Sequence, residues 1–333
     1  MRHPPRFGAA TLVVVMLVAT ISTLDAPAQA AIPASPVAQV WTEPSAGYGF
    51  LDAAISGAKY DIDVSMYELS DPVAERDLVA RAKAGVDVRV LLNADYDGRS
   101  ENASAYATLR AGGVHVEWAP SNQIFHAKYV VVDDRSAYIG TGNLVSYDYW
   151  STRDFWVVDD NPVDVAAVAA TFSSDFAHRV LEGEGPDGLV WSPGSTAALL
   201  SLINSAHSSL LVENEEMDVR SIELALEAAA ARGVNVDVVM TQDSQWTPAL
   251  RALASDRVHV RTLNSSEVYI HAKVICADCS ARAGTVFVGS ENFSISSLSY
   301  NRELGVVTHS LVAVTAVAQA VRSDFAVGTP VSP

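Results

Sequence analysis

The sequence predicts an α/β fold built from two tandem copies of one domain. Helical and β-strand patterns alternate along the chain, which is typical of layered α/β folds. One motif is written twice, at residues 124–133 (IFHAKYVVVD) and at residues 270–278 (IHAKVICAD). Each half has about 150 residues, which is enough to enclose a core of its own.

The first half begins with three pairs of a helix followed by a strand. Helical and alternating patterns of apolar residues distinguish the two kinds of element. In chain order the predicted elements are helix 51–59, strand 60–66, helix 72–84, strand 86–92, helix 101–111 and strand 114–118. Gly85 follows the second helix, where a glycine favours a helix end. The first copy of the motif comes next.

The second half repeats this scheme with small changes in length. Its predicted elements are helix 200–206, strand 209–213, helix 221–232 and strand 234–240. The last strand begins 148 residues after its counterpart, whereas the motif histidines are 145 residues apart, so the loop between them is three residues shorter. The asparagines that follow the motifs are 149 residues apart, which predicts a four-residue insertion in the turn 279–284.

Both halves also close on the same four residues, Ser-Asp-Phe-Ala, at 174–177 and 323–326. Self-similarity over this length indicates two copies of one domain rather than a solenoid of short repeats. The N-terminal domain is predicted at residues 31–185 and the C-terminal domain at residues 186–333. The glycine-rich stretch 183–188 (GEGPDG) is the predicted linker.

The first 30 residues are predicted to be a signal peptide. Arg2 and Arg6 precede an apolar segment at residues 9–21, and Ala28-Gln-Ala30 is a small-residue cleavage site. The apolar segment is too short for an ordinary membrane span, and an uncleaved anchor is the alternative interpretation. We therefore expect a secreted, extracellular protein with no transmembrane segment after cleavage.

The chain is strongly acidic, with a formal net charge of −17. Removal of residues 1–30, which hold two arginines and one aspartate, makes the net charge −18. Such a surface repels polyanions, and non-specific nucleic-acid binding depends mostly on lysine and arginine. The charge disfavours nucleic acids and strongly anionic membranes but leaves zwitterionic lipids open. A local basic cleft would still permit a nucleic acid.

The two cysteines, Cys276 and Cys279, stand close together in the second motif. Zinc would need more ligands than one such pair supplies, and no second pair exists. A thioredoxin-like redox motif would be followed by the start of a helix, and no such helix start follows these cysteines. Export to an oxidising compartment favours a disulfide between them.

The doubled motif places a histidine and a lysine two residues apart, His126 with Lys128 and His271 with Lys273. In strand-like runs this spacing points both side chains to one face. A histidine beside a fixed cation suits the chemistry of phosphate esters. A single His-x-Lys would be interpreted as a surface histidine on a strand edge, but a repeated one favours a functional site.

Each motif continues into a Gly-(Thr/Ser)-x-Asn sequence, at residues 140–143 and 289–292. The complete pattern, His-x-Lys-x4-Asp followed by Gly-(Thr/Ser)-x-Asn, resembles the signature of the phospholipase D superfamily. The resemblance covers nearly the whole chain after residue 30. It implies two phospholipase D-like α/β sandwich domains, related by a pseudo-twofold axis, with one active site at their interface.

Hydrolysis of a phosphodiester needs a nucleophile, a proton for the leaving oxygen, and positive charge around phosphorus. One histidine can attack while neutral and the other can donate a proton while charged. The lysines and the motif asparagines can stabilise the phosphoryl oxygens, and we expect no metal or other cofactor. By analogy with secreted two-motif members of the superfamily, His126 would be the nucleophile and His271 the acid, although the sequence does not break the symmetry. The predicted catalytic residues are His126, Lys128, Asn143, Asp154, His271, Lys273, Asn292 and Glu303.

The two acids of this set stand eleven residues after the asparagines. In the superfamily a glutamate near this position orients the histidines, often as Asn-x-Glu, and Asn301-Arg-Glu303 fits that pattern. Asp154 departs from it with a shorter side chain, so a surface carboxylate is the alternative there. Asp133 and Asp278 complete the motifs, but their odd spacing from the lysines points them to the other strand face, and we expect them to be structural, fixing the following turn.

Other polar and aromatic residues near the motifs have less definite predicted roles. Thr141 and Ser290 could bind the phosphate or belong to turns, and Glu68 and Glu216 align between the halves without a role. Four aromatic residues could line an apolar entrance for acyl chains or belong to the core. These are Tyr147, Tyr149, Trp150 and Trp156.

The favoured function is a secreted phospholipase D-like phosphodiesterase, expected to be a monomer that meets its substrate at a membrane or micelle surface. It would hydrolyse, or transfer, the headgroup of a glycerophospholipid such as phosphatidylcholine, giving phosphatidate through a phosphohistidine intermediate. One alternative is an extracellular, metal-independent nuclease of the same superfamily. A catalytically inactive phosphate-binding module is the other.

Overall fold

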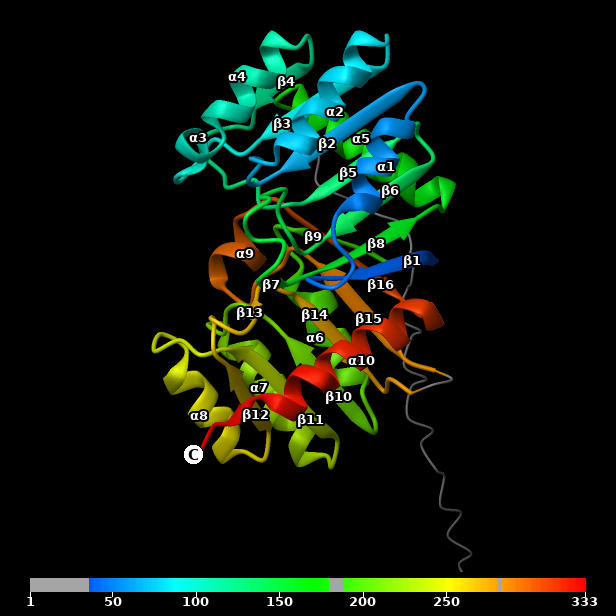
Figure 1. Ribbon diagram of the computed structural model, residues 1–333. Helices are drawn as coiled ribbons and strands as arrows, with labels where there is room; N and C mark the ends of the chain where they lie inside the picture. The colour runs from blue at the N-terminus through cyan, green and yellow to red at the C-terminus, as the bar shows by residue number, and fades with distance from the viewer. Residues whose placement is uncertain (1–35, 180–187, 281–282) are drawn as a thin grey trace, which may run out of the picture. The chain divides into compact units, whose positions relative to one another are not determined.

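The computed structural model describes residues 36–179, 188–280 and 283–333 (Figure 1). These residues belong to one compact unit, residues 32–333. The predicted signal peptide lies outside the described residues. So do most of the predicted linker and the predicted domain boundary between residues 185 and 186. Within the described residues, no helix is both long enough and apolar enough to cross a membrane.

Helices and strands alternate through both halves, as the sequence predicts. The first half contains β1 (Val37–Thr42), α1 (Gly49–Gly57), β2 (Asp61–Met66), α2 (Pro72–Lys83), β3 (Asp87–Leu92), α3 (Gly98–Glu101), α4 (Ala103–Ala111), β4 (His115–Trp118), β5 (Tyr129–Val132), β6 (Ser136–Gly140), β7 (Thr152–Arg153), β8 (Phe155–Asp159) and α5 (Pro162–Phe176). The second half contains β9 (Leu189–Ser192), α6 (Thr196–Ser205), β10 (Ser209–Glu213), α7 (Arg220–Ala231), β11 (Asn235–Thr241), α8 (Thr247–Ser255), β12 (His259–Leu263), β13 (Tyr269–Ile270), β14 (Val274–Ala277), β15 (Thr285–Gly289), α9 (Ile295–Ser299), β16 (Glu303–Thr308), α10 (Leu311–Val327) and β17 (Thr329–Pro330).

Each half has one large mixed sheet, and the two sheets have equivalent strand orders. The first is ordered β1-β8-β6-β5-β2-β3-β4 and the second β9-β16-β15-β14-β10-β11-β12-β17. In each, the three strands that alternate with helices are parallel, and the remaining neighbours are antiparallel. Among the described strands of these two sheets, only the edge strand β17 has no counterpart. The predicted α/β class and the predicted duplication are both confirmed.

Local sequence accounts for the equivalent helices α2 and α7. Helix α2 begins behind Asp71, whose side chain accepts a hydrogen bond from Val73 N at 2.8 Å, and Pro72 fits the first helical position because it needs no N–H donor there. Both helices are followed by a glycine in the left-handed region, Gly85 with φ 90° and Gly233 with φ 93°. A side chain with a Cβ would be strained there, so both glycines favour the turn into the next strand.

Three clusters of buried apolar side chains hold the layers together. One lies under α1, α2 and α4 in the first half, and another lies under α6, α7 and α8 in the second. The third belongs to both halves, because it joins α5 side chains such as Phe172 and α10 side chains such as Val317 to strands of both sheets. Figure 1 shows α10 running along the strands of the second sheet near β1. This shared core fixes the two halves to each other.

Short backbone pairings also cross between the halves. Strand β7 pairs in parallel with β13, which matches Thr152 with Tyr269 and Arg153 with Ile270. The equivalent pairing on the other side is a bridge between Phe125 and Arg302. Each of these segments lies next to a predicted catalytic residue. The crossings therefore bring the two motifs to one place.

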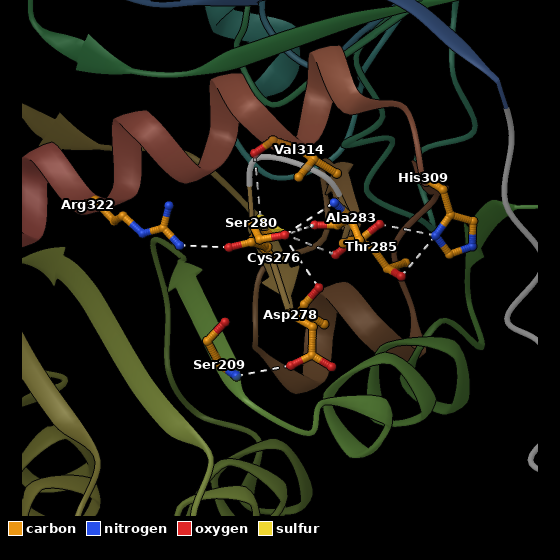
Figure 2. Close-up of a disulfide and its surroundings, with 12 residues drawn as sticks. Ser209, Cys276, Asp278, Ser280, Ala283, Thr285, His309, Val314 and Arg322 are labelled. Atoms are coloured by element: carbon orange, nitrogen blue, oxygen red, sulfur yellow. Dashed lines mark hydrogen bonds between the residues drawn. A yellow bond between two sulfur atoms is a disulfide. The ribbon is translucent and has the colours of Figure 1, made fainter.

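The motif aspartates and the cysteines have structural places. Asp133 accepts hydrogen bonds from the backbone N–H groups of residues 59–61, and Asp278 accepts from those of residues 207–209 (Figure 2 shows the bond from Ser209). The backbone that they hold therefore lies before β2 and β10, not in the turn that follows each aspartate. Cys276 and Cys279 form a disulfide beside Asp278. The predicted insertion at 279–284 includes residues 281 and 282, which lie outside the described residues.

Candidate active site

The two His-x-Lys segments come directly before strands β5 and β14, not on them as the sequence suggested. Their backbone bonds to the opposite half instead. His126 N and Ala127 N both donate to Arg302 O at 2.9 Å, and His271 N donates to Arg153 O at 3.2 Å. Glu303 and Asp154 follow these arginines in the chain. The same contact that positions each histidine therefore positions an acid next to it.

His126 is paired with an acid from the other half. Its Nδ1 lies 2.8 Å from Glu303 Oε2, and Ser297 Oγ and Asn301 Nδ2 donate to the other carboxylate oxygen at 2.6 and 3.1 Å. Burial works to raise the pKa of Glu303, but His126 and Lys128 hold it below its ordinary value. Because an ionised carboxylate can only accept, Nδ1 carries the proton in this pair.

The free nitrogen of His126 is therefore its Nε2. Burial lowers the pKa of His126 to about 4, and the nearby lysines act in the same direction while Glu303 opposes them. At neutral pH the ring is uncharged, and its proton sits on Nδ1. Nε2 then holds a lone pair, which is the form a nucleophilic histidine needs.

His271 has the equivalent arrangement, with an acid from the first half. Its Nδ1 lies 2.9 Å from Asp154 Oδ1, and Thr141 Oγ1 donates to the same oxygen. Asp154 is buried, and although burial works to raise its pKa, His271 and Lys273 hold that pKa below its ordinary value. The predicted pairing of Asp154 with a histidine is therefore present, and the alternative of a surface carboxylate is wrong. Gly142 makes room for it, because a Cβ there would lie 2.8 Å from the Asp154 carboxyl carbon.

Both motif lysines are fully buried. The Nζ of Lys128 donates to the carbonyl of His126, and the Nζ of Lys273 donates to that of His271 at 2.5 Å. Lys128 also lies over the ring of Tyr67, 5.0 Å from its centroid. Burial and the charge of Lys273 lower the pKa of Lys128 to about 7. Two buried lysines in one site can donate charge-assisted hydrogen bonds to the oxygens of a phosphoryl group.

The motif asparagines open onto two cavities, one beside each histidine. His126 and Asn292 line a cavity of about 350 Å³, together with Tyr67, Glu216 and Trp246 among others. His271 and Asn143 line a smaller one of about 170 Å³. The Oδ1 atoms of both asparagines are buried without a hydrogen-bond partner among the described residues. A substrate could therefore reach both histidines from the surface.

Thr141 and Ser290 hold the backbone and the acids around the site. Thr141 Oγ1, besides its bond to Asp154, accepts from Phe155 N at 2.9 Å. Ser290 Oγ accepts from Leu304 N at 3.1 Å. Both hydroxyls thus hold the segments that carry the orienting acids.

Glu215 also lies in the site, although the sequence did not predict it. Its Oε2 lies 3.0 Å from Lys273 Nζ and 3.7 Å from His271 Nε2, and it accepts from Asn292 Nδ2 at 3.2 Å. Its counterpart at the same offset of 148 residues is Tyr67, whose ring packs against His126. Alignment of the two halves at this offset shows that Tyr67 stands where the second half has Glu215. The next residues, Glu68 and Glu216, are the same in both halves and so show no such difference.

The four aromatic residues near the first asparagine divide between core and surface. Trp156 is buried, and Tyr149 stacks on Tyr48 while its hydroxyl donates to Asp71. Tyr147 and Trp150 are 72% and 79% exposed. Tyr147 directly precedes Asp148, which lines the cavity beside His271, and Trp150 follows it two residues later. Only these two can contribute to an entrance.

The comparisons with known proteins agree with this architecture. The sequence matches the family described as "Cardiolipin synthase, PLD-like domain" twice, over residues 51–178 and 199–326. A mitochondrial cardiolipin hydrolase from Xenopus laevis is 28% identical over 116 residues, which are 35% of this chain and 54% of that protein. The chain thus matches about half the length of this relative.

Two solved structures share the fold. Phosphatidylserine synthase from Haemophilus influenzae superposes with a TM-score of 0.69 at 12% identity, covering 90% of this chain and 89% of that one. Polyphosphate kinase from Porphyromonas gingivalis superposes with a TM-score of 0.66 at 16% identity, covering 86% of this chain and 50% of that one. At such identities the likeness concerns the fold alone.

The fold and the doubled motif define a two-domain phospholipase D-like protein. The chain belongs to the PLD-like family and so to the phospholipase D superfamily, whose members are phosphodiesterases and phospholipid-modifying enzymes. Among the described residues no group of three or more histidines, cysteines and acids is arranged to hold a metal ion.

Proposed function

We propose that the protein is an exported phosphodiesterase that removes the headgroup of a glycerophospholipid through a phosphohistidine intermediate. The observation that carries the proposal is the pair of histidines, each held at Nδ1 by an ionised acid of the other half. The Nε2 of His126 attacks phosphorus, and His271 protonates the leaving oxygen. Lys128 and Lys273 stabilise the charge that develops on the phosphoryl oxygens. One chain supplies both halves, so the enzyme acts as a monomer.

A phospholipid suits the surroundings of the site better than a nucleic acid. The cavity beside His126 is lined by Glu216 and Asp218, and the cavity beside His271 by Asp148. A polyanion would meet repulsion there. Exposed apolar side chains, including Tyr96 and Ile295 at the first cavity and Trp150 near the second, suit contact with a lipid surface. The family description and the name of the Xenopus relative, a cardiolipin hydrolase, also support a phospholipid.

The test is one assay of the purified protein on phosphatidylcholine in mixed micelles and on single-stranded DNA. Both reactions are run in excess EDTA, since the lysines supply the positive charge that a metal would otherwise bring. We expect release of choline with formation of phosphatidate, no cleavage of DNA, and no release by His126→Asn. Cleavage of DNA alone would identify the nuclease of the same superfamily. Binding to micelles without turnover would identify an inactive module.

Export is part of the same proposal, and the signal-peptide pattern at residues 1–30 supports it. Protein recovered from the culture medium should begin at Ala31 by mass spectrometry. Intact protein retained with the cell membrane would show that the leader is an uncleaved anchor.

A further inference from the structure

Both halves contribute a histidine, a lysine and an asparagine to the site. They differ in one residue that follows the equivalent strands β2 and β10. After β2 this residue is Tyr67, and after β10 it is Glu215. Tyr67 places an uncharged ring 4.7 Å from the His126 ring. Glu215 places a carboxylate beside His271. The two halves of the site are therefore related by pseudo-twofold symmetry in their fold but differ in the charge beside the histidine.

The Glu215 carboxylate is held at both oxygens. Its Oε1 accepts from Tyr269 OH at 2.7 Å, and its Oε2 contacts Lys273, Asn292 and the Nε2 side of His271. Although burial works to raise the pKa of Glu215, Lys273 and His271 hold it far below its ordinary value. These neighbours thus favour the ionised form of the carboxylate. His271 has an anion on each side, since Asp154 faces its Nδ1.

We infer that Glu215 is the positioning residue that makes His271 the proton donor and leaves His126 as the nucleophile. A carboxylate near Nε2 favours a proton on that nitrogen, because an ionised carboxylate can only accept a hydrogen bond. Among the described residues, the acid that contacts His126 directly is Glu303, at Nδ1, and Lys128 and Lys273 favour the neutral form of the ring. The inference rests on the proposed phosphodiesterase activity and assigns the roles within it.

These residues account for every bond and proton in the two steps of the reaction. In the first, His126 Nε2 forms a bond to phosphorus, the bond to the leaving oxygen breaks, and the Nε2 proton of His271 passes to that oxygen. In the second, neutral His271 takes a proton from water as the water oxygen bonds to phosphorus and the phosphorus–nitrogen bond breaks. Glu215 stays anionic throughout and stabilises the charged ring at the start and at the end.

Glu215 has a second effect, because it contacts two donors that the phosphoryl group also needs. Before a substrate arrives, Glu215 partly neutralises the charge of Lys273 and occupies an N–H donor of Asn292. Removal of the charge should therefore strengthen the binding of an anion while it weakens proton donation. A residue that only supported the fold would weaken both. This opposition is the signature of the proposed role.

Glu215→Gln keeps the size and removes the charge. The other charged groups that face His271 remain, namely Asp154, Lys273, Asp148 and Glu68. The variant is assayed on phosphatidylcholine and on the matching p-nitrophenyl ester, whose leaving group needs little protonation. We expect kcat to fall about tenfold or more on the choline ester and less than about threefold on the p-nitrophenyl ester, since general acid catalysis contributes about 10²–10⁴-fold in all. The inhibition constant of inorganic phosphate should decrease.

Two further variants keep the test decisive. Glu216→Gln removes the same charge from the next residue and should show no preference between the two esters. Tyr269→Phe keeps the Glu215 charge but loosens its hold, so it should give a weaker form of the same pattern, and it serves if Glu215→Gln fails to fold. The inference would be overturned if kcat of Glu215→Gln fell equally on both esters, or did not fall at all. If only Tyr269→Phe folds, the same two outcomes in that variant would overturn it. Absence of turnover of either ester by the unaltered enzyme would instead refute the proposed function.

Discussion

Burial and a few close neighbours decide the charge of each side chain in the site. His126 and Lys128 are both buried, and both have their pKa lowered, to about 4 and about 7. The consequences are opposite. The lowered pKa makes the histidine usable as a nucleophile at neutral pH, whereas it brings the lysine close to losing its charge. Glu303 and Asp154 oppose this trend because each is held ionised by a histidine.

A pH profile of kcat/KM should show both groups. As pH falls through about 4, His126 gains a proton and activity is lost; as pH rises through about 7, Lys128 loses its proton and activity declines again. In Lys128→Arg the guanidinium stays charged, so the alkaline limb should move to higher pH even though the rate is lower. The exposed Lys83→Arg is the matched control and should leave both limbs in place. An alkaline limb that stays put in Lys128→Arg would assign it to another group.

Sequence reasoning found the site residues that occur twice and missed the one that does not. His126, Lys128 and Asn143 each have a counterpart, and repetition separated them from ordinary polar residues. The same argument reached Asp154, in spite of its shorter side chain, through its equal distance from the asparagine. Glu215 has a tyrosine as its counterpart, so repetition could not identify it. Its role became visible only from its distances to Lys273 and His271.

At the level of secondary-structure elements, the predictions agree with the structure wherever local patterns decide. Helices α2 and α7 and strands β3 and β11 lie within a few residues of their predicted bounds. The His-x-Lys segments were wrongly placed on strands, because their backbone partners lie in the opposite half, more than 100 residues away. No local pattern reports such a partner. The motif aspartates illustrate the same point, since Asp133 and Asp278 each hold a loop that lies some 70 residues earlier in the chain.

The loop before β2 should depend on Asp133. Burial works to raise the pKa of Asp133, but the N–H groups of residues 59–61 outweigh it and lower that pKa. Asp133→Asn should lower the free energy of unfolding by about 1 kcal/mol, because the carboxylate is partly exposed and its hydrogen bonds are screened. Catalysis by the folded fraction should not change. Chemical denaturation and kcat measured side by side provide the check.

Asp134→Asn is the matched control for this substitution. It removes the same charge at the next residue, which also has a positive φ, 48° against 55° for Asp133. Because the Asp133 pKa is lowered in the folded state, its contribution exists above the unfolded value of about 4 and disappears as pH falls. The difference between the unaltered protein and Asp133→Asn should therefore shrink in acid. Equal destabilisation by both variants would show that only net charge matters.

At the level of the whole molecule, the two halves complete each other. Arg153 pairs with Asp324 at 2.6 Å, and the equivalent Arg302 pairs with Asp175 at 2.7 Å. A shared apolar core joins α5 and α10. Each histidine also takes its acid from the other half. A chain with two copies of one domain thus has a single composite site, and its two copies are free to take different roles.

Acid quenching of the enzyme during turnover of a phospholipid, followed by peptide mapping of the phosphate, tests this account most directly. The phosphate should be found on His126, and His126→Asn should show neither label nor turnover. His271→Asn should keep some label with the p-nitrophenyl ester, since that substrate leaves without the proton. A phosphate on His271 would contradict the division of roles. No label on either histidine, under conditions that trap a known phosphohistidine, would contradict the covalent mechanism and favour direct attack by water.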